Sequence, residues 1–382
     1  MAGARAGALA RSDIRTIVEE AWAVPDALRL EVGEPDFPTP PWITEAAAAA
    51  ARRGETRYTS NFGIPPLREA IAAKLVERNG YPATADQVVV TQGGVQALHL
   101  SLLTLLDPGD EVLLPDPAWP NFRMMAALVG AREVLYGLAQ GNAFLPDLDE
   151  LQALVTPRTK VLVVNFPSNP LGSTATAAQL GAICDFAARH DLWLISDECY
   201  DELTFDGPIV SAAAVSSYER IIGIYSFSKV YAMTGWRVGY AVAPPDTAAI
   251  LAKVQEPLVS CINTPAQYAA LAALEGNQAI VAEMKASYRH RRDIVLERLI
   301  AAGLSAPRPS GAFYVWLDIS ECGFDSLTFC RRLLAEESVA VAPGGAFGPA
   351  GQGKVRLSIA TAEGTLVEAV ARLGRFIDRH RT

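Results

Sequence analysis

The sequence predicts an α/β protein whose larger domain is built on a mainly parallel sheet of seven strands. Short β-rich runs recur through the middle of the chain, several of them are almost wholly apolar, and helical patterns separate most of them. Apolar runs are typical of strands covered on both faces, and alternation with helices is typical of parallel sheets. The runs are 88–91, 111–115, 133–136, 161–165, 192–196, 221–225 and 238–242.

Helices are expected between these strands, for example over 94–106 and 177–190. Asp107-Pro108-Gly109 ends the first of them with residues that favour turns.

The sequence pattern changes after about Met284, where a long charged helix containing YRHRRDIVLERLIAAG is expected. A hairpin-like piece over 311–318, a helix, a short strand near Val339, the strand VRLSIA and a last helix follow. This order predicts a second, smaller α+β domain, which the proline-rich GEPDFPTP near residue 33 joins. The predicted division is an N-terminal arm over 1–29, a small domain over 30–44 and 284–382, and a large domain over 45–283.

Composition narrows the function classes. The 382 residues carry a formal net charge of −9 and no long Lys or Arg run, so nucleic acid is not an expected partner. No stretch reaches the about 20 apolar residues of a membrane span, and the opening lacks the apolar core of a secretory signal. Five cysteines without a C-x-x-C pair favour free thiols and a cytoplasmic location over disulfides or a metal site.

Ligands of an open parallel sheet gather at the carboxyl ends of its strands. The first strand runs through Gly93, Gly94 and Val95 into a helix, where free amides and the helix dipole favour an anion, although a plain tight turn is the alternative. Neither G-x-G-x-x-G nor G-K-[ST] is present there, so a single phosphate group is the better match.

Three further strand ends carry candidate ligand-binding residues. Trp119, held between prolines, can present a flat face to a planar ring, with a core tryptophan as the alternative. Asn169 of NFPSNP can hydrogen-bond a ligand oxygen, although Asn-Pro is also common in turns. Asp197 follows an apolar strand and needs a partner, which a cationic ring nitrogen or a helix cap would supply.

The sixth strand leads to Lys229 within SFSKVYAMTGWRVGY, where no acid adjoins the lysine and Arg237 follows eight residues later. An unpaired buried ammonium loses its proton readily. Together, the strand ends supply the parts needed to hold pyridoxal phosphate.

These residues lie in ordered motifs that closely resemble the class I aminotransferases, pyridoxal-phosphate enzymes of fold type I. SFSKVYAMTGWRVGY is the strongest motif, and the resemblance runs from about Ile14 to the C-terminus. The supporting motifs are GEPDFPTP, RYTSNFGIPPLREAI, NFPSNPLG, SDECYDEL and VRLSIA.

The resemblance implies the following cofactor-binding roles. Lys229 matches the lysine that bonds covalently to the cofactor's aldehyde and later shuttles the substrate's proton. Asp197 matches the aspartate that keeps the pyridine nitrogen protonated. Tyr200 and Asn169 match the residues that bond the ring oxygen, and Trp119 matches the stacking aromatic residue.

The resemblance also implies how phosphate and substrate are held. Ser226, Arg237 and the amides from Gly93 to Val95 match the phosphate cup. Tyr58 matches a tyrosine that reaches the phosphate from the neighbouring subunit, which implies a homodimer with shared active sites.

Arg356 resembles the arginine that grips the substrate α-carboxylate bidentately, helped by Asn169 and the backbone of Gly33.

The sequence departs from the family pattern at a few pocket positions. Gly94 and Val95 stand where many relatives carry a hydroxyl residue or a lysine, and Phe166 and Leu171 stand where serine and threonine are frequent. In one large subgroup of the relatives that prefer aspartate or glutamate, a lysine at the position of Val95 meets the distal carboxylate. Because that position is apolar here, we expect a neutral amino donor (aliphatic, aromatic or alanine-like) and a 2-oxo acid acceptor such as 2-oxoglutarate or pyruvate. The donor side chain is expected near Ile14, Ile17, Val95 and Asn263.

Three other functions fit parts of the pattern. A pyridoxal-phosphate lyase, cyclase or oxidase would share the scaffold and the first chemical steps. A ligand-sensing regulatory protein would usually add a basic DNA-binding segment, which this chain lacks. A dinucleotide-dependent dehydrogenase would need the glycine fingerprint that is missing.

Overall fold

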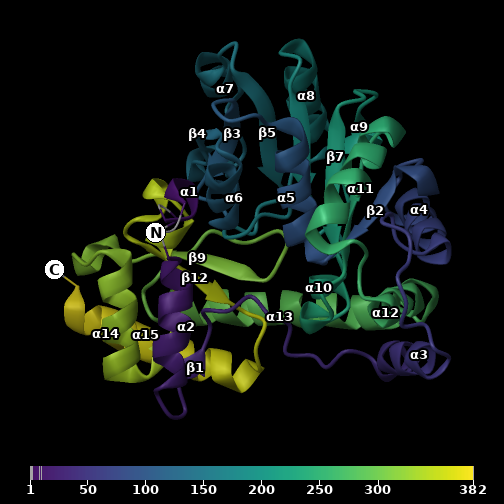
Figure 1. The fold of residues 1–382 in the computed structure, drawn as a ribbon. Helices are drawn as coiled ribbons and strands as arrows, with labels where there is room; N and C mark the ends of the chain where they lie inside the picture. The colour runs from purple at the N-terminus through teal and green to yellow at the C-terminus, as the bar shows by residue number, and fades with distance from the viewer. Residues whose placement is uncertain (1–2, 8, 10, 382) are drawn as a thin grey trace.

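The computed structural model describes residues 3–7, 9 and 11–381, so residues 1, 2, 8 and 10 of the predicted arm lie outside the described part. A seven-stranded sheet of order β2-β8-β7-β6-β5-β3-β4 forms its centre (Figure 1). The strands are β2 (Val88–Thr91), β3 (Glu111–Asp116), β4 (Arg132–Gly137), β5 (Thr159–Asn165), β6 (Trp193–Asp197), β7 (Ile221–Ser226) and β8 (Gly239–Val242).

All seven predicted strands are present, with ends that differ by at most two residues. The pairs from β4 through β3, β5 and β6 to β7 are parallel, whereas β8 runs antiparallel to both β7 and β2. The predicted mainly parallel sheet is therefore confirmed.

Helices cover both faces of this sheet because alternate strand residues point to opposite sides. Val161 and Val163 pack with α5 (Gly93–Leu105), α6 (Asn121–Val129) and α11 (Pro245–Val259). Leu162 and Val164 pack with α7 (Leu148–Leu154), α8 (Ala177–Arg189) and α9 (Ala212–Val215) on the other face. The helices predicted over 94–106 and 177–190 correspond to α5 and α8.

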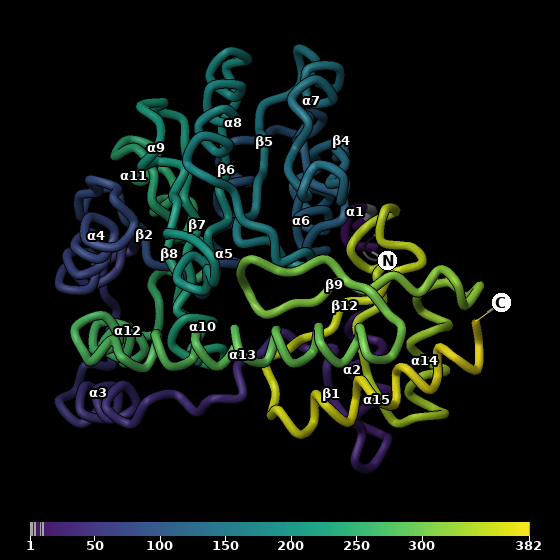
Figure 2. Tube along the Cα trace, turned by 180° about the vertical axis from the view of Figure 1, so that it is seen from behind, coloured from purple at the N-terminus to yellow at the C-terminus, as the bar shows by residue number. Residues whose placement is uncertain are grey.

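Three helices gather at the β2 edge of the sheet, namely α3 (Pro41–Arg52), α4 (Pro65–Asn79) and α12 (Thr264–Glu275). From there α13 (Ala279–Ala301) runs below the seven-stranded sheet to the smaller domain (Figure 2). Short helices α1 (Ala4–Gly7) and α10 (Phe227–Val230) complete this part.

The smaller domain carries a three-stranded antiparallel sheet of order β11-β12-β9. Its elements are α2 (Asp13–Trp22), β1 (Leu28–Arg29), β9 (Tyr314–Asp318), α14 (Ser326–Glu337), β10 (Val339–Ala340), β11 (Ala342–Pro343), β12 (Lys354–Ser358) and α15 (Glu363–His380). One hydrophobic core joins α2, the end of α13, these strands and α15. The two-domain architecture is confirmed, and the exact domain boundaries stay a prediction.

The predicted hairpin over 311–318 was wrong in its pairing. Only Tyr314–Asp318 forms a strand, and its partner is β12 rather than the preceding residues. Those preceding residues bond elsewhere, because the backbone amides of Ser310 and Gly311 both donate to the carbonyl of Gly172, each at 2.9 Å.

Candidate active site

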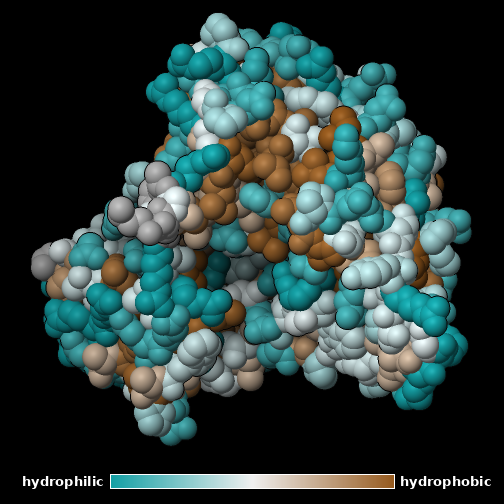
Figure 3. All heavy atoms as spheres, in the orientation of Figure 1, coloured by the Kyte–Doolittle hydropathy of each residue, from teal (hydrophilic) through white to brown (hydrophobic). Residues whose placement is uncertain are grey.

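A cavity of about 800 Å³ opens between the two domains, at the carboxyl ends of β5, β6 and β7. Figure 3 shows this face of the molecule hollowed between its two lobes. Its size suits a small cofactor together with a substrate. Eleven of the predicted site residues line it: Gly33, Gly94, Val95, Trp119, Asn169, Asp197, Tyr200, Ser226, Lys229, Arg237 and Arg356.

Lys229 lies on α10, the short helix that follows β7. Its Nζ donates a hydrogen bond of 2.6 Å to the carbonyl of Gly33. Burial lowers the pKa of Lys229 to about 8, and the cations Arg356 and Arg237 act in the same direction. The lysine is therefore partly neutral near pH 8, as a nucleophilic amine and general base must be.

Asp197 ends β6 and faces the same cavity, 6% exposed. Burial raises the pKa of Asp197 to about 6, although hydrogen bonding from Cys199 partly opposes this. The amide of Cys199 donates to its Oδ1 at 3.1 Å, and within the described chain no cation lies within ion-pair distance. A buried acid without a cation fits a protonated ring nitrogen, so this residue suits the cofactor that the sequence implies.

Asn165, Asn169 and Tyr200 form the cavity wall beside Asp197. Asn165 accepts a hydrogen bond from the amide of Asn169 at 2.7 Å and donates to the carbonyl of Asp197 at 3.0 Å. The hydroxyl groups of Tyr200 and Tyr314 lie 2.7 Å apart. These contacts join the ends of β5 and β6 to the smaller domain.

Arg356 extends from β12 into the cavity, although it is only 3% exposed. Its Nη1 donates to Oδ1 of Asn169 at 2.9 Å, and its Nη2 donates to the carbonyl of Glu31 at 2.7 Å. The guanidinium lies 4.3 Å from the ring centre of Tyr314, and its Nε is buried without a hydrogen-bond partner. An unsatisfied N–H on a buried cation is suited to bind a carboxylate.

The start of α5 lies where a phosphate is expected. Gly93 has a φ of +78°, and a Cβ on it would lie 2.7 Å from Nη2 of Arg237. A Cβ on Gly94 would lie 2.6 Å from Sγ of Cys199. Both positions therefore require glycine, and the backbone can approach a ligand closely. Gly93 itself does not line the cavity.

The remaining predicted residues differ in position. Trp119 lines the cavity and packs edge-on against Phe122, with ring centres 5.7 Å apart. Tyr58 lies away from this cavity and is 89% exposed.

Of the residues expected near the donor side chain, Ile14 and Val95 line the cavity and two do not. Ile17 was wrongly expected there, because α2 turns it into the core of the smaller domain. Asn263 was also wrongly expected, because it caps α12 by accepting from the amide of Ala266 and lines a neighbouring cavity of about 770 Å³.

The cavity residues that the sequence did not single out include Arg15, Asn165, Cys199 and Tyr314. Asn165 ends an apolar strand as Asp197 does, and this signal could have found it. Cys199 lies in the turn after β6, where its amide bonds to the carboxylate of Asp197, and it lines the same cavity. Tyr314 gave no signal, because its contact with Tyr200 depends on how the two domains pack.

Two classes of feature are not found in the described part of the chain. No helix there is long and apolar enough to cross a membrane. No group of three or more His, Cys, Asp or Glu side chains is arranged there to hold a metal ion.

Comparisons with known proteins agree with this geometry. The family model "Aminotransferase class I and II" matches residues 25–373. Aspartate/prephenate aminotransferase of Thermus thermophilus is 42% identical, covering 93% of this chain and 92% of that protein. Aromatic-amino-acid aminotransferase 2 of Thermococcus litoralis is 38% identical, covering 96% and 95%.

Solved structures agree as well. The structure of aspartate aminotransferase from Thermus thermophilus with maleate has a TM-score of 0.94 at 40% identity, covering 98% of this chain and all of that one. The aromatic aminotransferase from Pyrococcus horikoshii has a TM-score of 0.90 at 39% identity, covering 95% and 99%. This chain therefore belongs to the class I and II aminotransferases, pyridoxal-phosphate-dependent enzymes of fold type I.

Proposed function

We propose that this enzyme binds pyridoxal 5′-phosphate in the cavity through Lys229 and transfers the α-amino group of a neutral amino acid to a 2-oxo acid. One observation carries the proposal. An amine whose pKa is lowered and an acid whose pKa is raised, Lys229 and Asp197, line one cavity at the ends of neighbouring strands. Opposed shifts of this kind are typical of acid–base sites.

The residues of the cavity suit the parts of this cofactor. When bound, the cofactor supplies an aldehyde that takes up the amino group and a ring that withdraws electrons from the substrate's α-carbon. Asp197 would hold the ring nitrogen in its protonated form, and Arg237 with the start of α5 would hold the phosphate. Trp119 would bound the ring on one face.

The chain's own groups would then perform the proton transfer. Arg356 would bind the α-carboxylate through its free Nε and a shared Nη, which fixes the α-carbon close to Lys229. The Nζ of Lys229, partly neutral because of its lowered pKa, would accept the α-proton. Tyr200 would donate a hydrogen bond from its hydroxyl group to an oxygen on the ring.

A neutral donor is favoured by the apolar side of the cavity. Val95 and Ile14 line it, and Arg29 is already engaged, since its Nε donates to Oε1 of Glu31 at 2.6 Å. A second carboxylate on the donor would therefore find no cation at the position of Val95.

An acidic donor such as aspartate is the second candidate. Arg15 also lines the cavity, and within the described chain no acid pairs with it. Several relatives are named for aspartate as substrate. In the favoured assignment, Arg15 instead meets the second carboxylate of an acceptor such as 2-oxoglutarate.

The experiment measures the rates of half-reactions with aspartate, leucine, phenylalanine and alanine as donors. Each reaction is monitored through the absorption spectrum of the cofactor. The proposal expects a neutral amino acid to react fastest, with amino transfer to the acceptor in equal amounts. An aspartate rate tenfold or more above the other three would overturn the donor class. Keto acid released without amino transfer would favour a lyase or oxidase.

Arg15→Gln separates the two uses of that arginine. We expect a raised KM for 2-oxoglutarate and an unchanged KM for the neutral donor.

A homodimer with shared active sites is part of the proposal. Tyr58 is 89% exposed and outside its own chain's cavity, as a residue that serves a neighbouring subunit would be. Figure 3 also shows apolar residues gathered on the face above the hollow. In hybrids of one Tyr58→Phe subunit with one Lys229→Ala subunit, the only intact Lys229 would have to take its Tyr58 from the partner.

We also place the enzyme in the cytoplasm, supported by five cysteines that all remain free thiols.

A further inference from the structure

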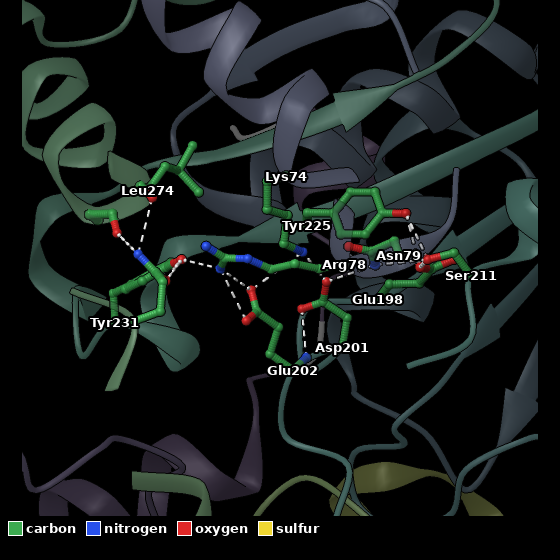
Figure 4. A network of polar contacts seen from close by, with 12 residues as sticks. Lys74, Arg78, Asn79, Glu198, Asp201, Glu202, Ser211, Tyr225, Tyr231 and Leu274 are labelled. Carbon is green, nitrogen blue, oxygen red and sulfur yellow. Dashed lines mark hydrogen bonds and ion pairs between the residues drawn. The ribbon is translucent and has the colours of Figure 1, made fainter. Parts of the chain in front are cut away.

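A buried polar network lies outside the active-site cavity, between α4 and the segments that follow β6 and β7 (Figure 4). It combines two cations with three carboxylates, although none of these groups lines the active-site cavity. Its labelled members are Lys74, Arg78, Asn79, Glu198, Asp201, Glu202, Ser211, Tyr225, Tyr231 and Leu274.

Lys74 is the most deeply buried cation of this network, at 6% exposed. Its Nζ forms a short ion pair with Asp201 and lies 3.5 Å from a carboxylate oxygen of Glu202. Nδ2 of Asn79 donates to the same oxygen of Asp201 at 3.0 Å. Burial alone would lower the pKa of Lys74, but the two acids more than offset it and raise that pKa.

Arg78, one turn further along α4, links two segments of the chain. Its Nη1 lies 3.3 and 3.2 Å from the two carboxylate oxygens of Glu202 and donates to the hydroxyl of Tyr231 at 3.0 Å. That hydroxyl donates in turn to Oε1 of Gln278 at 2.9 Å. The amide of Gln278 then caps α12 by donating to the carbonyls of Ala273, Leu274 and Gly276.

Glu198 anchors the other side of the same loop. Its carboxylate accepts from Ser196 at 2.9 Å, from Tyr225 at 2.9 Å and from the amide of Ala212 at 3.0 Å, and Ser211 donates to it as well. Acidic anchors thus stand on both sides of Tyr200.

The anchored segments are the ones that carry the catalytic groups. Glu198 adjoins Asp197, Asp201 adjoins Tyr200, and Tyr231 follows Lys229 by two residues. Buried ion pairs add little net stability, because the cost of desolvation cancels most of their attraction. Removing one partner is nevertheless costly, because the other charge is left buried and unpaired. A rigid second layer of this kind is what keeps catalytic groups within a fraction of an ångström.

We propose that Arg78 and Tyr231 are positioning residues for Lys229. Through their hydrogen bond, and through Glu202, the turn that carries Lys229 is held at a fixed place relative to the loop that carries Tyr200. This inference rests on the proposed roles of Lys229 and Tyr200.

Tyr231→Phe tests the link with little change of shape, since only the hydroxyl is removed. Tyr136→Phe is the matched control, because Tyr136 is also buried and its hydroxyl donates to the carbonyl of Val163 at 2.7 Å. Tyr136 lies on β4, the edge strand at the other end of the sheet from β2. We expect Tyr231→Phe to lower kcat about tenfold with KM within about twofold. The control is expected to lose thermal stability without this loss of kcat.

Hydrogen exchange supplies a readout that does not depend on activity. The backbone amides of Tyr231 and Met233 donate to the carbonyls of Phe227 and Ser228. We expect these two amides to exchange about tenfold faster in Tyr231→Phe than in wild type or in the control. Unchanged exchange and unchanged kcat in Tyr231→Phe, with only a lowered Tm, would overturn the proposal.

Arg78→Lys and Arg78→Met form a second pair. The lysine keeps a cation beside Glu202, so we expect it to retain clearly more kcat than the methionine. An equal loss of kcat in the two variants would count against positioning through the positive charge of Arg78. A wild-type enzyme without any transamination would instead refute the proposed function, and the exchange comparison would still decide the positioning role.

Discussion

Nζ of Lys229 donates a hydrogen bond of 2.6 Å to the carbonyl oxygen of Gly33, a residue 196 positions earlier in the chain. The contact joins the large domain to the loop of the smaller domain that carries the GEPDFPTP motif. Gly33 has no room for a side chain, because a Cβ would lie 2.8 Å from Cζ of Tyr314. The glycine therefore allows the loop to approach both the lysine and the tyrosine.

Gly33→Ala should displace this loop. We expect kcat/KM to fall at least about tenfold, because the carbonyl that contacts Lys229 and the wall beside Tyr314 both move. Steady-state kinetics measure the loss. Gly141→Ala, at a position with open space around its Cβ, is the control and should behave as wild type.

Asp197→Asn should stabilise the cofactor-free protein at neutral pH. Burial raises the pKa of Asp197 from 3.8 to about 6, so the folded state holds a proton that the unfolded state has lost between these values. Wild-type stability is therefore expected to fall as the pH rises from 4 to 6, by about 2–3 kcal/mol, and to stay low above it. Urea unfolding of both proteins at pH 4 and pH 7.5 measures this. An asparagine variant no more stable than wild type at pH 7.5 would contradict the assignment, and the same variant should lose activity.

Arg356→Lys should weaken carboxylate binding. The lysine cannot reproduce the fork that binds Asn169, Glu31 and a carboxylate together. We expect KM for both the amino acid and the 2-oxo acid to rise about 10-fold to 100-fold. An amine without an α-carboxylate serves as the control substrate, and its reaction should be far less affected. If the reaction of the amino acid and that of the control amine were impaired to a similar degree, the substitution would be shown to damage the fold instead.

Gly94→Ala should impair cofactor binding in a way that Cys199→Ala relieves. A Cβ at Gly94 would lie 2.6 Å from Sγ of Cys199, so α5 must shift away from the phosphate position unless the sulfur is removed. Spectroscopic titration should give about a tenfold weaker Kd for Gly94→Ala and partial recovery in the double variant. Equal losses with and without Cys199 would remove the steric explanation.

Much of the larger domain could be predicted from the sequence, because its strands are short apolar runs with local turn signals at their ends. Asp197 and Lys229 were found for the same reason, since one ends a buried strand and the other lies three residues after the end of one. The strand pairing of the smaller domain was harder to predict, since β9 pairs with β12 across a long sequence separation. Ile17 shows the limit most clearly, because periodicity cannot tell which side of α2 faces the cavity.

The positioning network could not be predicted either. Lys74 and Arg78 lie on a helix whose charged residues resemble a solvent-exposed face, yet Lys74 is 6% exposed. Only the packing of α4 against the loop after β6 turns these residues inward. Isolated charges in a helix do not reveal such a partner.

The central claim is that the amine of Lys229 bonds covalently to pyridoxal 5′-phosphate. The direct measurement is borohydride reduction of the cofactor-loaded enzyme followed by peptide mass spectrometry. We predict one pyridoxyl-phosphate adduct, located on Lys229, in wild type and none on this peptide in Lys229→Ala. A colourless protein without an adduct on residue 229, or an adduct on another lysine, would contradict the account.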